Sequence, residues 1–211
     1  MSILRETVDF FEKGGPMMIP LLASSIVALA VTLERLIQLK HKRVLDPHLV
    51  NMVNNIHTIK DVEMLNSICH NSNSSLANVI RTGLENRHLP PSELKELFED
   101  SGRQETRNLE RGLGALETVA VSSPLMGLLG TVLGMLKVFN VISEIGVGQA
   151  SALSAGISQA LITTIFGLSI GIPALIAYNY FTHKVEDLVA DIEKCSIVLF
   201  HKLRSMNTAN Q

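Results

Sequence analysis

Aromatic and charged residues are scarce in this sequence. It contains no tryptophan, and aromatic residues make up only 4% of it. Charged residues reach 18%, against roughly 25% in an ordinary soluble domain. The formal net charge of −2 provides no basic excess, which argues against nucleic acid as a partner. The two cysteines, Cys69 and Cys195, fit neither a metal site nor a disulfide framework, so we interpret them as reduced thiols without a role.

The usual motifs of enzymes and metal sites are also missing. The sequence has no phosphate-binding loop, no G-x-S-x-G and no carboxylate pair with a cleft to serve. The seven histidines are scattered, and no two of them have ligand spacing on one helix face. We therefore predict a protein that is not an enzyme, with no catalytic residues, no cofactor and no metal.

Long hydrophobic runs are present instead. Hydrophobic residues make up 46% of the chain, and its mean hydropathy is +0.28. A membrane helix needs about 20 mostly apolar residues, and we predict such helices at residues 16–39, 113–141 and 155–181. The first run has acidic residues before it and continues into Glu34 and Arg35, so we interpret it as a retained span rather than a cleaved signal peptide.

The basic residues predict the orientation of these spans. The segments Leu39–Arg43 and Arg103–Arg111 are basic at both ends of the central loop, which places residues 40–112 in the cytoplasm. Residues 1–15 and the turn at 142–154 are then periplasmic, and the tail at 182–211 is cytoplasmic. Lys137 is expected to reach the periplasmic interface, and the Glu34–Arg35 pair to anchor the inner one or to contact a neighbouring subunit.

The cytoplasmic segments have helical periodicity. We expect three short helices between residues 40 and 90, the second of them capped by Thr58 with Asp61. A further helix, with Ser92 as its N-cap, is expected to run unbroken into the second span. The third span is expected to continue similarly beyond residue 182. The predicted fold class is thus all-α, a polytopic membrane protein with three spans, two of them extended into the cytoplasm.

Small residues lie along one face of the second and third spans. In the second span Gly127, Gly130, Thr131 and Gly134 share a face, and in the third Ala160, Thr164, Gly167 and Gly171 do so, with Ser158 and Thr163 nearby. Such faces allow helices to approach closely in lipid. From spacing alone they line a pore or pack one span against another, and each threonine can also bond a carbonyl one turn back.

No Asp, Glu, Lys or Arg lies in the middle of any span. A protein that moves protons by itself usually has a titratable group at membrane depth. This chain has hydroxyls and Gln159 instead. If protons cross here, we expect a partner protein to supply the carboxylate.

Three segments carry a family resemblance. Residues Gly14–Leu36, the GLLGTVLGM stretch within Ser123–Phe139, and the ALITTIFGLSIGIPALIAYN stretch within Gly156–Phe181 resemble the MotA/TolQ/ExbB proton-channel family, closest to ExbB and TolQ. The resemblance implies a pentameric ring in the bacterial inner membrane whose second and third spans line a pore. It also implies an ExbD- or TolR-like single-span partner in that pore and a TonB- or TolA-like protein that carries the work outward.

Particular positions match the family pattern. Thr131 and Thr164 match its pore threonines, with Thr163 beside them, and Pro124 and Pro173 match helix prolines. Glu117 matches an acid near the cytoplasmic mouth. Gln159 departs from the pattern, because many ExbB and TolQ chains have glutamate there, so a proton step in this chain would depend on hydroxyls, water and the partner's aspartate.

The resemblance leaves the cargo open. An ExbB-like role in outer-membrane transport is preferred. A TolQ-like role in outer-membrane integrity, a motility-type stator and a scaffold that conducts nothing are the alternatives. A flagellar MotA proper is disfavoured, because that branch has four spans and a larger cytoplasmic loop.

Overall fold

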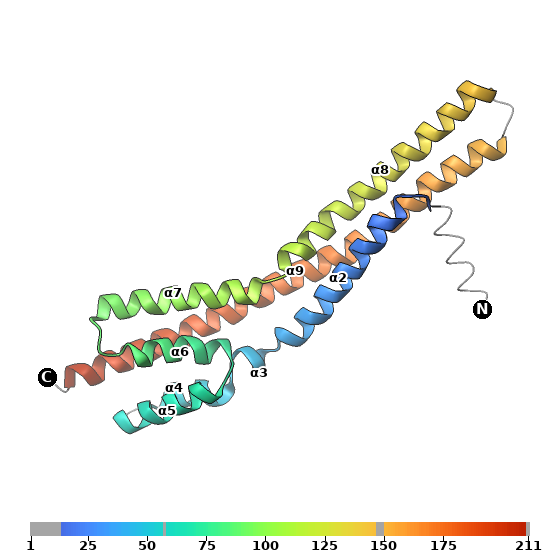
Figure 1. Cartoon of the computed structure of the whole chain (residues 1–211). Coiled ribbons are helices and arrows are strands. Elements are labelled where there is room, and N and C mark those ends of the chain that lie inside the picture. The colour runs from blue at the N-terminus through green and yellow to red at the C-terminus, as the bar shows by residue number, and fades with distance from the viewer. Residues whose placement is uncertain (1–13, 57, 147–149, 210–211) are drawn as a thin grey trace, which may run out of the picture. The chain divides into compact units, whose positions relative to one another are not determined.

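The structure is a computed structural model of the chain, in which residues 14–56, 58–146 and 150–209 are described (Figure 1). Helices make up nearly all of this part, and no strand occurs in it. The helices are α2 (Met18–Gln38), α3 (His41–Val44), α4 (Pro47–Asn55), α5 (Ile59–Asn71), α6 (Ser75–Glu85), α7 (Pro91–Glu110), α8 (Leu113–Ile145) and α9 (Ala150–Ala209). The predicted all-α class is confirmed.

The chain divides into two compact units. The first, here called the apolar unit, comprises residues 1–33 and 112–180, and the second, the polar unit, comprises residues 34–111 and 181–211. Both α2 and α9 contribute residues to each unit. The functional residues expected from the sequence all belong to the apolar unit.

Three helices are long and apolar enough to cross a membrane: α2, α8 and α9. In the apolar unit, Met18 and Leu21 of α2 pack against Ile162 of α9, with Met126 and Phe166 beside them. Many large aliphatic side chains on the same helices remain exposed, such as Ile19, Leu128 and Ile176. An apolar outer surface of this extent is what a helix in lipid, or against another membrane protein, requires.

The polar unit has a conventional buried core. Leu49 and Val53 of α4, Leu65 of α5 and Ile80 of α6 are buried, and so are Leu188 and Leu199 of α9. One helix, the single turn α3, was not expected. Between α6 and α7, Asn78 donates to the carboxylate of Glu105 at 3.0 Å.

Aromatic and basic side chains attach α9 to other helices of the polar unit. The rings of Phe98 on α7 and Phe200 on α9 stack edge to face, with centroids 6.4 Å apart. Near its C-terminal end, Lys202 of α9 donates to the carbonyl of Ile56, the C-cap of α4, at 3.3 Å.

Helix capping follows the sequence at one helix and departs from it at another. The predicted capping box of α5 is confirmed, because Thr58 accepts from the Asp61 amide and Asp61 accepts from the Thr58 amide. The prediction that Ser92 caps the next helix is wrong. Pro90 is the N-cap of α7 and Pro91 occupies the first helical position, where a missing N–H costs nothing.

The expected unbroken helix from α7 into the second span is also wrong. Helix α7 ends at Glu110, and α8 starts at Leu113. Gly112 between them has φ of +84°, a left-handed conformation that glycine adopts without steric cost. Helix α9 does run unbroken through both units, for 60 residues.

Candidate functional site

The small residues of α8 and α9 face each other in the apolar unit. A methyl group at Gly127 would lie 2.9 Å from the Thr163 carbonyl oxygen and 3.1 Å from the Thr164 Cα. At Gly167 it would lie 2.5 Å from the Ser123 carbonyl oxygen and 2.9 Å from the Gly127 Cα. Glycine is therefore required at both positions for the backbones to approach this closely.

The same contact continues along both helices, and we call it the glycine seam. A methyl group at Gly134 would meet the Ala160 side chain and the Gly156 carbonyl oxygen, each at 2.9 Å. Gly130 faces the side chain of Thr163, and Gly171 faces the ring of Pro124. The small faces thus pack α8 against α9 within one chain, which was one of the two readings that spacing left open.

Two threonine hydroxyls meet at the centre of the seam. Thr131 of α8 and Thr164 of α9 are hydrogen-bonded to each other, and both are partly buried. Both are also placed to donate to the carbonyl oxygen of Gly127, each at 3.2 Å. Thr131 also lies 3.4 Å from the Ala160 carbonyl, while the buried Thr163 donates to that carbonyl at 2.9 Å.

This pair has more acceptors than protons. Each hydroxyl carries one proton and can accept as well as donate. Thr131 can donate to Gly127, Ala160 or Thr164, but to only one of them at a time. By rotating its O–H bonds, the pair can therefore change which oxygen is free to receive a proton without moving either helix.

Gln159 of α9 contacts Lys137 of α8 and Gly15, which precedes α2. Its side-chain oxygen accepts from the ammonium of Lys137 on α8 at 3.5 Å. Its amide lies against Gly15, just before α2, where φ is +72° and a methyl group would clash with the amide nitrogen. The Lys137 side chain is exposed.

The remaining sequence-predicted residues lie apart from the hydroxyl pair. Glu117 is exposed in the first turns of α8. Pro124 lies inside α8 against Gly171, and Pro173 lies inside α9 with its side chain exposed.

The expectation that the Glu34–Arg35 pair anchors the inner interface or contacts a neighbouring subunit stays a prediction. Arg35 is 2% exposed and donates to the carbonyl of Leu109 at 3.2 Å, within the same chain.

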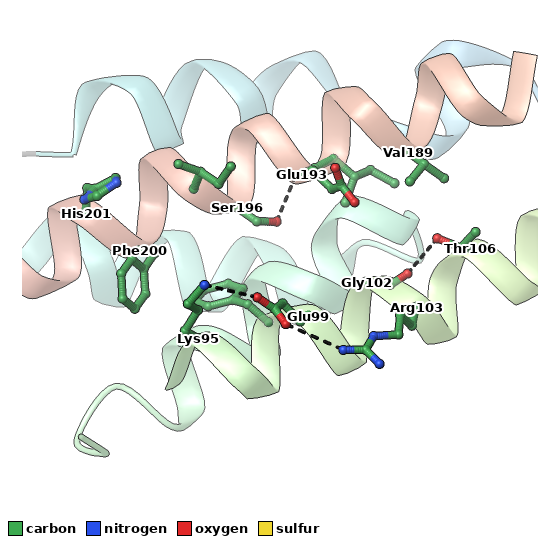
Figure 2. A pocket seen from close by; sticks show the side chains of 13 residues that line it. Lys95, Glu99, Gly102, Arg103, Thr106, Val189, Glu193, Ser196, Phe200 and His201 are labelled. Atoms are coloured by element: carbon green, nitrogen blue, oxygen red, sulfur yellow. Dashed lines mark hydrogen bonds and ion pairs between the residues drawn. The ribbon is translucent and has the colours of Figure 1, made fainter. Parts of the chain in front are cut away.

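A groove of about 630 Å³ lies between α7 and α9 of the polar unit (Figure 2). Phe98, Ile192 and Phe200 line it, and Lys95, Glu99 and Arg103 lie on its α7 side. Glu99 pairs with both basic residues, at 3.4 and 3.5 Å. Within the described residues, no group of three His, Cys, Asp or Glu side chains could hold a metal ion.

The expected bond from a threonine to a carbonyl one turn back occurs at Thr131, which is placed to donate to Gly127. Sequence reasoning missed the contacts between helices, from Thr164 to the Gly127 carbonyl and from Thr131 to the Ala160 carbonyl, because spacing within one helix does not show which carbonyl of another helix lies nearby. It also missed Ser123, whose hydroxyl is fully buried in α8 with no partner among the described residues. The lone lysine at the end of an uncharged run was the available signal for the Lys137–Gln159 contact.

Comparison with known proteins identifies the family of the chain. The model of the MotA/TolQ/ExbB proton channel family matches residues 71–194, which include all of α8 and most of α9. The chain belongs to this family. The expected resemblance is thereby confirmed, and the glycine seam with its hydroxyl pair lies inside the matched region.

Individual relatives agree. An ExbB homolog of Methanothermobacter thermautotrophicus is 31% identical over 192 residues, covering 88% of this chain and 66% of the relative. An ExbB-like protein of Synechocystis sp. is 32% identical over 176 residues, covering 82% of this chain and 69% of the relative. The Tol-Pal system protein TolQ of Pseudomonas aeruginosa is 40% identical over 86 residues, covering 41% of this chain and 37% of the relative.

The chain therefore spans only about two thirds of the length of the first two relatives. Together with the three apolar helices, the family match and the bacterial ExbB and TolQ relatives support a multi-pass protein of the bacterial inner membrane.

Proposed function

We propose that this protein is the ring-forming subunit of a proton-driven complex of the ExbB type. In this proposal copies of the chain form a pentamer, and an ExbD- or TolR-like single-span partner lies inside the ring. Proton flow then performs work on a TonB- or TolA-like protein that serves outer-membrane transport. Names of relatives such as ExbB and TolQ support this proposal, and the hydroxyl pair gives it a chemical basis.

The observation that carries the proposal is the Thr131–Thr164 contact. A hydroxyl pair with alternative donors and acceptors can hydrogen-bond a partner's carboxyl group in either protonation state. It also carries no fixed charge that would trap the proton. Thr131, Thr164, Thr163 and Gln159 are the proposed pathway residues, with Glu117 at the cytoplasmic mouth.

In our proposal the neutral Gln159 has an electrostatic consequence. Its oxygen accepts from the Lys137 ammonium at 3.5 Å, so among the described residues Gln159 has a cation beside it and a neutral amide where many ExbB and TolQ chains have a carboxylate. A negative group that pairs with Lys137 can then be supplied by another chain. We therefore propose that the partner's carboxylate is the proton carrier of the complex.

The test of the pathway replaces Thr131 or Thr164 with valine, which keeps the shape and removes the hydroxyl. We expect both variants to assemble and to lose at least about tenfold in proton-driven transport, as removal of a directly participating proton-transfer group commonly costs. Thr131→Ser, which keeps the hydroxyl, should retain most activity.

Thr118→Val provides the matched control. Thr118 lies on the same helix and bonds the carbonyl of Gly114 at 2.7 Å, outside the seam. Transport should be unchanged in this variant. Full activity of both Thr131→Val and Thr164→Val would refute the pathway.

The composition of the complex is tested separately. Gentle extraction from the native host followed by native mass spectrometry should give a pentamer with a single-span partner that bears a membrane aspartate. The identity of that partner would decide between ExbB-like, TolQ-like and motility roles. A ring without such a partner would favour the scaffold alternative.

A further inference from the structure

Arg35 is a buried cation whose position calls for an explanation. Its exposed fraction is 2%, and its carbonyl accepts at 2.9 Å from the amide of Leu39, which directly follows α2 and is fully buried. Both residues belong to the polar unit. Burying a guanidinium is costly unless its charge and its donors are satisfied. Stability alone therefore does not account for an arginine here.

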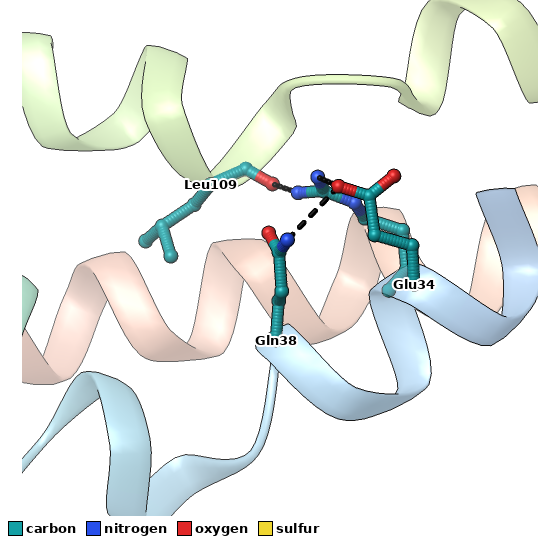
Figure 3. A network of polar contacts seen from close by, with 4 residues as sticks. Glu34, Gln38 and Leu109 are labelled. Atoms are coloured by element: carbon teal, nitrogen blue, oxygen red, sulfur yellow. Dashed lines mark hydrogen bonds and ion pairs between the residues drawn. The ribbon is translucent and has the colours of Figure 1, made fainter.

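The contacts of Arg35 show what it reaches (Figure 3). Nη1 donates to the carbonyl oxygen of Leu109 at 3.2 Å, and Nη2 lies 3.1 Å from the carboxylate of Glu34. That carboxylate is 51% exposed and also receives the amide of Gln38 at 2.9 Å. Nε has no partner within the described part of the chain. The anionic partner thus faces solvent, and the Leu109 carbonyl is the contact that binds Arg35 to a distant segment.

Leu109 lies in the last turn of α7, which ends at Glu110. The last four carbonyls of a helix have no intrahelical donor, and the helix dipole makes this end negative. A guanidinium that donates to the Leu109 carbonyl satisfies one of these groups and complements the dipole. Arg35 therefore acts as a C-terminal cap supplied from another helix.

The helical conformation is interrupted directly after this cap. Arg111 has ψ of 130°, outside the helical range, and Gly112 adopts φ of +84°. The first turn of α8 closes on the Gly112 carbonyl, which accepts from Ala115 at 3.2 Å and from Leu116 at 3.3 Å. This joint, residues 109–112, is also where the chain passes from the polar unit to the apolar unit. The first such passage, between residues 33 and 34, lies just before Arg35.

We propose that Arg35 is a positioning residue that fixes the joint between α7 and α8. By capping the last turn of α7 it determines where that helix stops, and it ties the end of α2 to the end of α7 within the polar unit. Its consequence for transport rests on the proposed function, because a joint between spans and cytoplasmic helices has to be held if proton flow is to do work.

The test is hydrogen–deuterium exchange of the intact complex in lipid nanodiscs, compared between the natural chain and Arg35→Met. Methionine keeps the length and loses the charge and the donors. We expect exchange of residues 107–116 to rise at least tenfold, while residues 91–102 of the same helix change less than twofold. Arg43→Met, which removes an exposed cation of the same region, should leave both segments unchanged.

A conservative variant separates capping from packing. Arg35→Lys keeps a cation and a donor, so exchange at 107–116 should rise about threefold, between the two other chains. If Arg35→Met fails to insert into the membrane, the exchange of Arg35→Lys at residues 107–116 tests the proposal. Unchanged exchange at 107–116 in both variants, or an equal rise across α4 to α7, would overturn the proposal. Proton transport plays no part in this readout, so a failure of the proposed function is recognised separately.

Discussion

At the scale of single residues, the site is a set of hydroxyls placed by backbone carbonyls. The sequence identified Thr131, Thr163 and Thr164 because they lie among glycines on two helix faces. It also allowed the bond of Thr131 to the Gly127 carbonyl one turn back, but it could not identify the contacts between helices, such as that of Thr164 with the same carbonyl. It also left Arg35 at an interface. The cap on Leu109 joins residues 74 positions apart, and no local pattern encodes such a contact.

The cysteines provide a test of burial at this scale. Burial raises the pKa of the Cys69 thiol from 9.0 to about 11, an effect that Arg81 partly opposes and Asp46 reinforces. Because the thiolate is the nucleophile, alkylation of Cys69 by iodoacetamide at pH 8 should be about a hundredfold slower than for a free thiol. Its rate should rise about tenfold per pH unit toward pH 11.

The same shift has a defined sign for stability. The folded state favours the neutral thiol, so the contribution of Cys69 to the free energy of unfolding is fully present below pH 9 and is lost as the pH rises toward 11.

In the alkylation experiment, replacing Cys195 with serine leaves Cys69 as the reporter. Labelling of Cys69 at the rate of a free thiol at pH 8, in the folded protein, would contradict its burial.

At the scale of helices, the predictions are correct where residues a few positions apart determine the structure. They are wrong where a contact between residues far apart in the sequence determines it. The Thr58 and Asp61 capping box needs only residues three apart, and it was predicted correctly. The end of α7 was not predicted correctly. A run without proline predicts a continuous helix, but a left-handed glycine at Gly112 and a cap from α2 end it.

The glycine seam can be tested on one helix. In Gly167→Ala the new methyl group would lie 2.5 Å from the Ser123 carbonyl and 2.9 Å from the Gly127 Cα, and neither backbone atom can rotate away. Because the methyl group pushes α8 and α9 apart, the free energy of unfolding should fall by about 1–3 kcal/mol, as overpacking commonly costs. Unfolding in detergent, followed by circular dichroism, measures the change.

Gly114 is the matched control for this substitution. It lies on α8 with no heavy atom within 4 Å of a methyl group placed there. Gly114→Ala should therefore leave stability within about 1 kcal/mol of the natural chain, or raise it through better helix propensity. Equal effects of the two alanines would show that the seam is not tightly packed.

At the scale of the whole molecule, the three apolar helices and the family were available from the sequence, because both depend on composition and on contiguous motifs. The division into two units was only partly available. The charge pattern indicated a polar loop and tail, but residues 34–111 and 181–211 join into one unit through contacts such as that of Phe98 with Phe200.

Orientation is the prediction that belongs to this scale. With the N-terminus periplasmic, a cysteine at Glu144 should react with a membrane-impermeant maleimide in spheroplasts. A cysteine at Ser67, exposed on α5, should react only after lysis. Both belong in a chain whose own cysteines are replaced by serine. The reverse pattern would invert the topology.

The glycine seam also constrains how this chain can change by mutation. Every single-base change in a glycine codon that alters the residue adds a side chain, so Gly127, Gly134 and Gly167 can only become larger. The outward aliphatic residues, such as Leu128 and Ile176, can exchange among leucine, isoleucine and valine without meeting a neighbour in this chain. Random mutagenesis with selection for transport should therefore leave the seam nearly invariant while the faces beside it drift.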